Sequence, residues 1–440
     1  MKFVLLHPPA KCHIRNLRTE SLGLAYIAAV LRRDGHEVEI LDAYLRDLNG
    51  AQAVKEILAR EFDVLAITAV HPHKNVLVSI VRAVRAKRKD AIIAVGGYLP
   101  TFSAAGFLAM CPEADLLVRG EGEAVASDVF GRIARGEEWR DAPGVAYLRD
   151  GSPVINPTPP IIADLDSLPF PARDALKFAS EHVEPAIYTS RGCYHNCSFC
   201  SLTAFYALSG KKPQRYRSAG NICDEVEQVI SETGRSTVVF VADDFIGPGK
   251  ENQVRAVQLA DEIRARKLAF KFSIECRADE VEEDTLSALK EAGLTRVFMG
   301  LESGVQRQLD TFNKHLTVEQ NRRAVEIVRR VGIGLHCGFI MYDPYTTPDE
   351  LLENMRFLKE MKLDVRNVPI SNVTLYPGAP LVEKVRADGL LIEKGMELSY
   401  RFRDPQTAFS WKMACAVNGY NELASRIRRC LKMGPDLDSA

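Results

Sequence analysis

Short apolar runs alternate with amphipathic stretches along residues 1–140. The apolar runs lack the apolar–polar alternation of a half-exposed strand, so they predict strands of a parallel sheet that is buried on both faces. The predicted strands are residues 3–7, 38–42, 64–69, 92–96 and 116–119, and the predicted helices are residues 22–34, 53–60 and 76–88. This strand–helix–strand order predicts an α/β first domain with a doubly wound, Rossmann-like sheet, whose ligand lies at the carboxyl ends of the strands.

The same alternation resumes near residue 185 and predicts six further strand–helix units. The predicted strands are residues 186–190, 237–242, 270–275, 296–300, 334–341 and 368–375, and the predicted helices are residues 222–232, 251–266, 283–291, 318–331, 348–362 and 381–388. Gly234 and Gly332 stand where glycine commonly ends a helix. Six units are too few for an eight-unit barrel, so they predict a partial (βα)6, TIM-like barrel with functional groups at the carboxyl ends of its strands.

A proline-rich segment separates the two alternating regions. Because proline fixes the backbone and removes hydrogen-bond donors, this segment predicts an ordered linker strapped across the domains. The chain therefore divides into a first domain (1–140), a linker (141–184), a barrel (185–390) and a helical C-terminal cap (391–440).

Composition narrows the class of protein. The chain has 440 residues, and 57 Lys and Arg against 58 Asp and Glu leave a formal net charge of -1, which argues against a broad nucleic-acid or membrane surface. No apolar run approaches the roughly twenty residues that a membrane span needs. The ten cysteines form one cluster and otherwise lie scattered, which fits a reducing cytoplasm rather than a disulfide framework.

The cysteine cluster follows the first predicted strand of the barrel. Cys193, Cys197 and Cys200 are spaced four and three residues apart, and Gly192 before them allows a sharp turn. Three thiolates on one loop can hold an iron–sulfur cluster but leave one iron open, for example to the amino and carboxylate groups of S-adenosylmethionine. Two alternatives remain at this point: a zinc site that adds His195 as the fourth ligand, and three unligated thiols.

The string CYHNCSFC resembles the cluster motif of the radical S-adenosylmethionine enzymes. The resemblance implies a [4Fe-4S] cluster on Cys193, Cys197 and Cys200, which together with S-adenosylmethionine generates a 5′-deoxyadenosyl radical. It also implies that Phe199 packs near the adenine and that an external donor such as flavodoxin or ferredoxin supplies electrons.

The strings DVLAITAVHPH, AVGGYLPTFSA and EADLLVRGEGEA resemble the cobalamin-binding domain that precedes many radical S-adenosylmethionine barrels. On that resemblance Gly96, Gly97, Gly120 and Glu121 lie near the corrin or its nucleotide tail, because paired glycines let the backbone approach a large flat ligand. The Asp-x-His-x-x-Gly motif of other cobalamin proteins is absent from the sequence, and His71 is a candidate cobalt ligand. The alternative is a domain that keeps the fold and binds nothing.

Polar residues stand at the carboxyl ends of consecutive barrel strands, as in the same family. The resemblance assigns S-adenosylmethionine contacts to Asp243, Asp244, Ser273, Glu275, Arg277 and Glu302. Ser273, Glu275 and Arg277 alternate toward one face of their strand. The fifth strand departs from the family pattern, and we expect substrate contacts from the residues that follow it, which are Tyr342, Asp343 and Tyr345.

The leading functional hypothesis is a cobalamin-dependent radical enzyme that methylates an unactivated carbon of a small metabolite. A second enzyme class is a cobalamin-linked radical cyclisation, oxidation or rearrangement without methyl transfer. A third hypothesis, from a different class, is a sensor that binds the cofactors without turnover. No nucleic-acid or membrane partner is expected.

Overall fold

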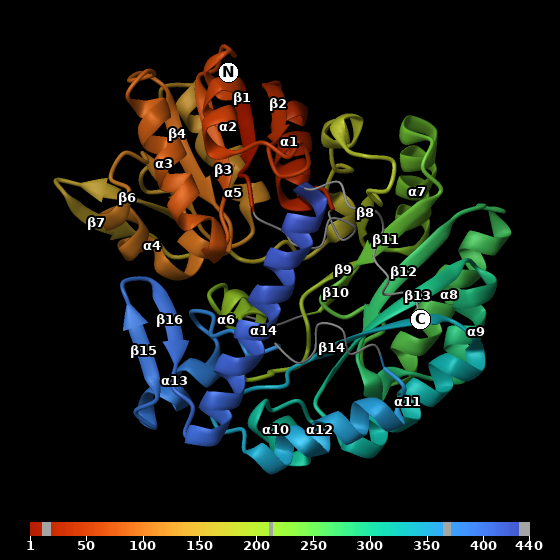
Figure 1. Ribbon diagram of the computed structural model, residues 1–440. Helices are drawn as coiled ribbons and strands as arrows, with labels where there is room; N and C mark the ends of the chain where they lie inside the picture. Colours follow the sequence, from red (N-terminus) through yellow and green to blue (C-terminus); the bar gives the residue numbers. More distant parts are fainter. Residues whose placement is uncertain (11–18, 211–213, 364–370, 431–440) are drawn as a thin grey trace.

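The computed structural model describes residues 1–10, 19–210, 214–363 and 371–430. Figure 1 shows two α/β bodies side by side, with a C-terminal hairpin next to them. The first body holds a seven-stranded sheet in the order β2-β1-β3-β4-β5-β6-β7, in which β1 to β5 are parallel and the last two strands are antiparallel. Its strands are β1 Lys2–His7, β2 Glu37–Asp42, β3 Val64–Thr68, β4 Ile92–Gly96, β5 Leu116–Val118, β6 Val145–Arg149 and β7 Ser152–Ile155.

Helices cover both faces of this sheet, as the unalternated apolar runs predict. These helices are α1 Leu22–Arg33, α2 Gly50–Leu58, α3 Lys74–Arg85, α4 Tyr98–Met110 and α5 Gly122–Ala134. Leu65 and Ile67 of β3 pack into a core with α2, α3 and α4, whereas Val64 packs into a second core with α1 and α5. The doubly wound, Rossmann-like prediction is therefore confirmed, although α4 and α5 were not among the predicted helices.

The beginning of the predicted linker is a β-hairpin that completes the first sheet. Strands β6 and β7 pair antiparallel across Asp150 and Gly151, whose φ angles are 52° and 76°. Two positive φ angles in a two-residue turn are typical of tight hairpins, and Asp-Gly is a preferred sequence for them. The prolines of residues 141–184 favoured the prediction of a linker over that of a hairpin. However, proline is tolerated in an edge strand such as β7, so its presence does not exclude the hairpin.

The second body is an open parallel sheet in the order β8-β11-β12-β13-β14. Its strands are β8 Ala186–Tyr188, β11 Thr237–Val241, β12 Lys271–Cys276, β13 Leu294–Glu302 and β14 Gly334–Phe339. Its outer face packs against α7 Ala219–Thr233, α8 Gly249–Ala265, α9 Glu283–Glu291, α11 Val318–Val331 and α12 Pro348–Glu360. The predicted sixth strand, residues 368–375, lies partly outside the described residues, and within them Asn372 forms one parallel bridge with Tyr342.

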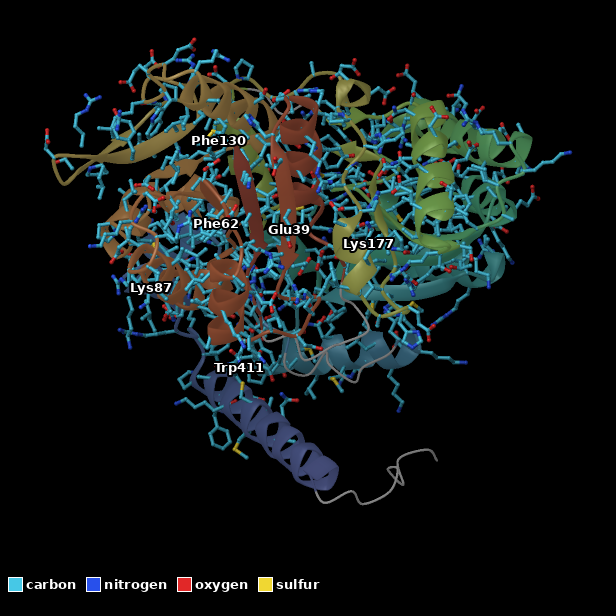
Figure 2. The ribbon with its side chains drawn as sticks, turned by 90° about the horizontal axis from the view of Figure 1, so that it is seen from above. Glu39, Phe62, Lys87, Phe130, Lys177 and Trp411 are labelled. Carbon is cyan, nitrogen blue, oxygen red and sulfur yellow. The ribbon has the colours of Figure 1, made fainter. Side chains whose placement is uncertain are left out.

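The C-terminal region differs from the predicted all-helical cap. After α13 Pro380–Ala387 come a hairpin of β15 Leu391–Lys394 and β16 Glu397–Tyr400, and then α14 Pro405–Cys430. Lys74 Nζ lies 2.7 Å from a Glu397 carboxylate oxygen, so the hairpin contacts the first domain. Figure 2 shows α14 extending away from the two bodies, with Trp411 at the end nearer to them. None of the helices in the described part of the chain combines the length and apolarity of a membrane span.

A buried ion-pair network joins the three parts of the chain. Arg173, from the linker, pairs with Glu20, which precedes α1, and with Glu225 of α7, and it also donates to the backbone carbonyl of Ala186 at 2.9 Å. Arg217 pairs with the other oxygen of Glu225. All four charged side chains are at least 94% buried. Removing one partner of such a network leaves buried, uncompensated charge.

We expect Arg173→Met to destabilise the protein by about 3–5 kcal/mol, because Glu20 and Glu225 would remain buried with less positive charge beside them. Urea unfolding followed by circular dichroism measures the loss. The matched control is Arg264→Met, because Arg264 of α8 makes only exposed ion pairs, with Asp261 of α8 and Glu291 of α9, and its loss should cost no more than about 1 kcal/mol. Equal losses in the two variants would contradict the structural role of Arg173.

Candidate active site

The cysteine loop starts at a two-stranded ribbon at the mouth of the barrel. Strand β9 Ser190–Arg191 pairs antiparallel with β10 Arg215–Tyr216. Gly192 follows with φ 88°, a conformation that a side chain disfavours, and its N–H donates to an Asp243 carboxylate oxygen at 2.6 Å. The backbone of Ser198 donates to the carbonyl of Phe312 at 2.7 Å, which fastens the far end of the loop.

The three thiols suit a cluster better than a single metal ion. Burial raises the pKa of Cys193 to about 12 and that of Cys200 to about 11, so both need nearby positive charge to become thiolates. Arg277 supplies such charge, with its Nη1 3.9 Å from Cys197 Sγ, and the buried Lys314 also interacts electrostatically with Cys197. In the part of the chain that the structure describes, the three cysteine sulfurs do not all lie within 4.8 Å of one another. A single tetrahedral metal ion would require them to be that close.

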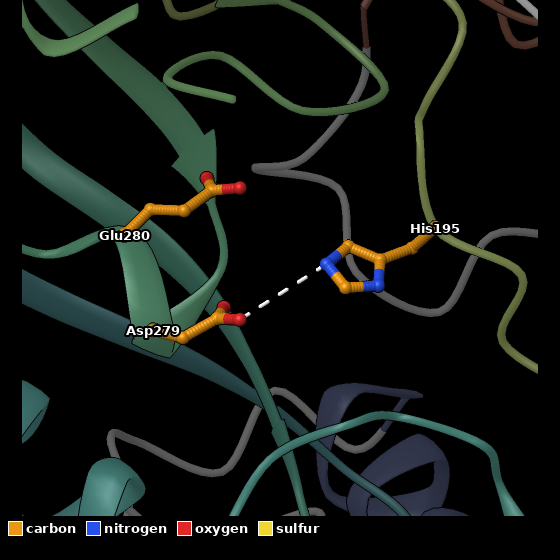
Figure 3. Close-up of side chains that lie close together, drawn as sticks. All are labelled: His195, Asp279 and Glu280. Atoms are coloured by element: carbon orange, nitrogen blue, oxygen red, sulfur yellow. Dashed lines mark ion pairs between the residues drawn. The ribbon is translucent and has the colours of Figure 1, made fainter. Parts of the chain in front are cut away.

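The zinc alternative required His195 as a fourth ligand, and the structure turns this side chain elsewhere. Figure 3 shows the His195 ring facing Asp279 and Glu280, with Nε2 4.0 Å from an Asp279 oxygen. These three side chains do form a compact ligand group. However, Arg277 already binds both carboxylate oxygens of Asp279, at 3.0 and 3.2 Å, and neutralises its charge. Glu280 accepts the hydroxyl of Tyr194 at 2.7 Å. The arrangement supports the loop and does not favour a cation.

The two aspartates after β11 have different surroundings. Asp243 accepts from Gly192 N–H and, at 3.2 Å, from the Tyr206 hydroxyl, so it orients the cysteine loop. Asp244 is 1% exposed, and neither carboxylate oxygen has a hydrogen-bond donor of good geometry in the described structure. Burial and the adjacent charge of Asp244 raise the pKa of Glu280 to about 9. Because Glu280 is therefore protonated at neutral pH, the Asp244–Glu280 pair keeps one buried negative charge, which suits an ammonium group such as that of S-adenosylmethionine.

The other residues predicted to bind S-adenosylmethionine lie on β12, β13 and the cysteine loop. Arg277 is committed to Asp279, the Lys314 carbonyl and the Cys197 sulfur, so it contacts the cysteine loop directly. Glu302 ends β13 with φ 61° and pairs with Lys314 at 2.9 Å. Phe199 packs edge-on against Phe312, with ring centroids 5.4 Å apart. Their contacts with S-adenosylmethionine stay predictions.

Ser273 and Glu275 lie further from the cysteine loop along β12. The Ser273 hydroxyl is 3.5 Å from Arg296, which pairs with Glu184 at 2.7 Å. Glu275 is exposed on the strand, and desolvation by its surroundings together with the charge of Asp243 raises its pKa. The predicted alternation toward one face is present, but only Arg277 reaches a cysteine of the loop.

The predicted substrate residues have protein partners. Asp343 is fully buried and accepts from the Tyr345 N–H at 2.7 Å and from Gln308 at 2.9 Å. The Tyr345 hydroxyl donates to Asp388 at 2.7 Å. Tyr342 packs against Trp411 of α14, with ring centroids 5.1 Å apart. These contacts hold the loop and the C-terminal helix together, so the structure offers no support for direct substrate contact.

The first domain contains a cavity of about 160 Å³ between its sheet and the helices α1 and α5. Glycines from five positions line it: Gly23, Gly96, Gly97, Gly120 and Gly122. A Cβ on Gly23 would meet nothing within 4 Å, so the space beside α1 is open to a ligand. The chemistry of this lining, apolar and with exposed backbone, fits an inserted heterocycle. Gly96, Gly97 and Gly120 line this cavity, and their contact with a corrin or its nucleotide tail stays a prediction.

Glu121 stands between Gly120 and Gly122, which line that cavity, but its carboxylate binds the barrel, and its contact with a cofactor stays a prediction. Its carboxylate pairs with Arg215 at 2.7 Å and lies 3.6 Å from Arg191, both on the ribbon beside the cysteine loop. Although burial opposes ionisation, hydrogen bonds from Arg215 hold the pKa of Glu121 below its usual value. The neighbouring Glu123 pairs with Arg191 at 2.6 Å. Glu121 therefore joins the two domains, and the structure shows it bound to arginine rather than lining the first-domain cavity.

A second cavity, of about 350 Å³, lies between the two domains. The first domain contributes Val70, His71, Tyr98 and Phe102, and the barrel contributes Ser201, which follows Cys200, with Tyr376 and Pro377. The ring of Tyr98 lies 5.0 Å from that of Phe205 in α6 Leu202–Ala207. Burial lowers the pKa of His71, so its imidazole is neutral at pH 7 and able to ligate a metal. His71 as a cobalt ligand stays a prediction.

Arg191, Arg215 and Lys314 are site residues that the sequence analysis missed. Arg191 stands two residues before Cys193, and that position was a usable signal. Arg215 and Lys314 lie outside any motif, and only the fold brings them to the loop.

Family models match both parts of the chain. The B12 binding domain matches residues 15–130, and the Radical SAM superfamily matches residues 187–358. An uncharacterized methyltransferase of Pyrococcus horikoshii is 29% identical over 399 residues, which cover 89% of this chain and 84% of the relative. The hopanoid C-3 methylase of Methylococcus capsulatus is 27% identical, over 86% of this chain and 71% of the methylase.

Solved structures agree on the fold of both domains together. The cobalamin-dependent S-adenosylmethionine radical enzyme OxsB, with aqua-cobalamin and S-adenosylmethionine bound, superposes with a TM-score of 0.81 at 20% identity, over 96% of this chain and 66% of that chain. The radical S-adenosylmethionine methyltransferase TsrM from Kitasatospora setae, with cobalamin and a [4Fe-4S] cluster bound, gives 0.70 at 18% identity, over 88% and 75%. With a match to the B12 binding domain, a match to the Radical SAM superfamily and a cavity between the two domains that Ser201, next to Cys200, lines, the chain belongs to the cobalamin-dependent radical S-adenosylmethionine enzymes.

Proposed function

We propose that the protein transfers a methyl group to an unactivated carbon of a small molecule. The observation that carries the proposal is the cavity of about 350 Å³ that both domains line, one residue beyond Cys200. A cofactor seated there contacts the cysteine loop from the side of the first domain. The Pyrococcus horikoshii relative, a methyltransferase by name, supports the proposal because this chain covers 84% of its length.

The chain's own residues position and shield the chemistry. When bound, the cluster, S-adenosylmethionine and cobalamin supply one-electron bond cleavage and the carriage of a methyl group. Cys193, Cys197 and Cys200 would hold the cluster, with Arg277 and Lys314 balancing its negative charge. Asp244 would hold the ammonium of S-adenosylmethionine.

A radical cyclisation without methyl transfer is a second candidate. The anaerobic magnesium-protoporphyrin IX monomethyl ester cyclase of Cereibacter sphaeroides is 27% identical over 377 residues, and the 4'-phospho-dehydrooxetanocin synthase of Priestia megaterium is 26% identical over 408 residues. However, this chain spans only 60% and 54% of those relatives. The larger coverage of the Pyrococcus horikoshii relative favours methyl transfer.

We propose an external one-electron donor, such as a flavodoxin or ferredoxin, and a cytoplasmic location. No disulfide joins the cysteines whose side chains the structure describes, which fits a reducing compartment.

Cys197→Ala should abolish both the visible absorbance of the reconstituted cluster and the formation of 5′-deoxyadenosine, because two thiolates remain for the cluster. Cys415→Ala is the matched control, since Cys415 is an exposed thiol on α14. Anaerobic ultraviolet–visible spectroscopy and product chromatography provide the measurements. A cluster of undiminished absorbance in Cys197→Ala would contradict the ligand assignment.

Methyl transfer itself is tested with methyl-deuterated S-adenosylmethionine. We expect the reduced, cobalamin-loaded protein to place the deuterated methyl group in a small-molecule product and to form 5′-deoxyadenosine, both measured by mass spectrometry. A product without the label, formed together with 5′-deoxyadenosine, would favour cyclisation or another rearrangement.

A pair of variants links this transfer to the first-domain cavity. Gly23→Leu should lower the cobalamin bound per protein and the label transfer together, because its side chain would project into a cavity of about 160 Å³. Gly23→Ala adds one methyl group and should lower both less.

A further inference from the structure

Three exposed side chains lie in register on neighbouring strands of the barrel. Glu275 of β12 pairs with Phe298 of β13, which pairs with His336 of β14. Glu275 and His336 are exposed, and Phe298 is 43% exposed although its strand lies inside the sheet. Adjacent strands are about 4.8 Å apart, so the three side chains form one continuous row.

This row lies on the inner face of the barrel. The residues that alternate with it point to the opposite side: Ile274 and Val297 belong to the core under the outer helices, and Leu335 packs against that core. Because successive side chains of a strand point to opposite faces, the row faces the concave side. An exposed phenylalanine and carboxylate there need a partner other than the protein core.

The row lies close to a residue that contacts the cysteine loop. Arg277, which lies 3.9 Å from Cys197 Sγ, is two residues beyond Glu275, or about 7 Å along an extended chain. The Glu184–Arg296 ion pair and Ser273 lie on the opposite side of the row, toward the amino ends of the strands. A molecule that rests on this row would therefore lie between the inner face of the sheet and the cysteine loop.

We propose that Glu275, Phe298 and His336 form the floor of the substrate site, and that the substrate carries a basic nitrogen on an apolar carbon skeleton. A carboxylate beside the face of an aromatic ring attracts a cation through charge and through the ring quadrupole. His336 offers a hydrogen-bond partner on the other side of the ring. This inference rests on the proposed methyl transfer and reassigns Glu275 from S-adenosylmethionine to substrate.

The test uses the full-length holoenzyme with reductant, methyl-deuterated S-adenosylmethionine and small-molecule extract of the cells that encode the protein. Cation exchange divides the extract into retained, basic compounds and an unretained remainder. We expect the retained fraction to stimulate 5′-deoxyadenosine formation and to accept the label. Glu275→Gln, Phe298→Leu and His336→Gln should each raise the half-saturating amount of that fraction by about tenfold or more, while the half-saturating concentration of S-adenosylmethionine changes by less than about twofold.

Matched variants separate a specific effect from a general one. Glu251→Gln and Phe409→Leu change the same residue types at exposed positions on α8 and α14 and should behave like the unmodified protein. Glu275→Asp and Phe298→Tyr should recover part of the loss, because each keeps the charge or the ring. Cluster absorbance of every variant shows whether the barrel has folded.

The remaining outcomes overturn the inference in distinct ways. A raised requirement for S-adenosylmethionine in Glu275→Gln would return this residue to the cofactor. Stimulation by the unretained fraction alone, or by neither fraction, would exclude a basic substrate. If Glu275→Gln, Phe298→Leu and His336→Gln behave like the control variants, these three residues do not bind substrate, and the proposed methyl transfer is unaffected. If the extract stimulates 5′-deoxyadenosine formation but the product carries no label, methyl transfer is refuted. The roles of Glu275, Phe298 and His336 are then still tested by the amount of extract that half-saturates 5′-deoxyadenosine formation in each variant.

Discussion

Two glutamates at the start of α5 and two arginines beside the cysteine loop form the contact on which the active site depends. Glu121 and Glu123 meet Arg191 and Arg215 at 2.6–3.6 Å, and Glu123 and both arginines are less than 9% exposed. The ring faces of Tyr26 and Tyr188 flank Arg191 at 5.1 and 5.2 Å. Since a buried charge without its partner is costly, these pairs hold the loop at one fixed position against the first domain.

Charge balance around the loop follows from that fixed position. The sulfur ligands of a cluster are negative, and Arg277 and Lys314 approach Cys197 from the barrel. Asp279 and Glu302 in turn bind these two cations. Asp244 and the protonated Glu280 together keep one buried negative charge, which an additional cation would balance. The site is therefore arranged for an ammonium group beside an anionic cluster.

Local patterns predicted both sheets and the cysteine loop, because apolar runs and a short motif are contiguous in sequence. The hairpin β6–β7 was missed, since proline in residues 141–184 outweighed the Asp150-Gly151 turn. Contacts between residues that lie far apart in the chain could not be predicted from local patterns. Glu121 looked like part of a cofactor loop, but it binds Arg215, 94 residues away. Asp343 was expected to contact substrate after a strand end, and nothing in the sequence indicated that Gln308 and Arg307 bind its carboxylate.

The most direct test of an active site shared by two domains is the magnetic interaction between Co(II) cobalamin and the reduced cluster, measured by electron paramagnetic resonance. A cofactor in the cavity lined by His71 and Ser201 lies beside the cysteine loop, so reducing the cluster should broaden the cobalt signal and shorten its relaxation time. A cobalt signal whose width and relaxation are unchanged by cluster reduction would contradict a shared site.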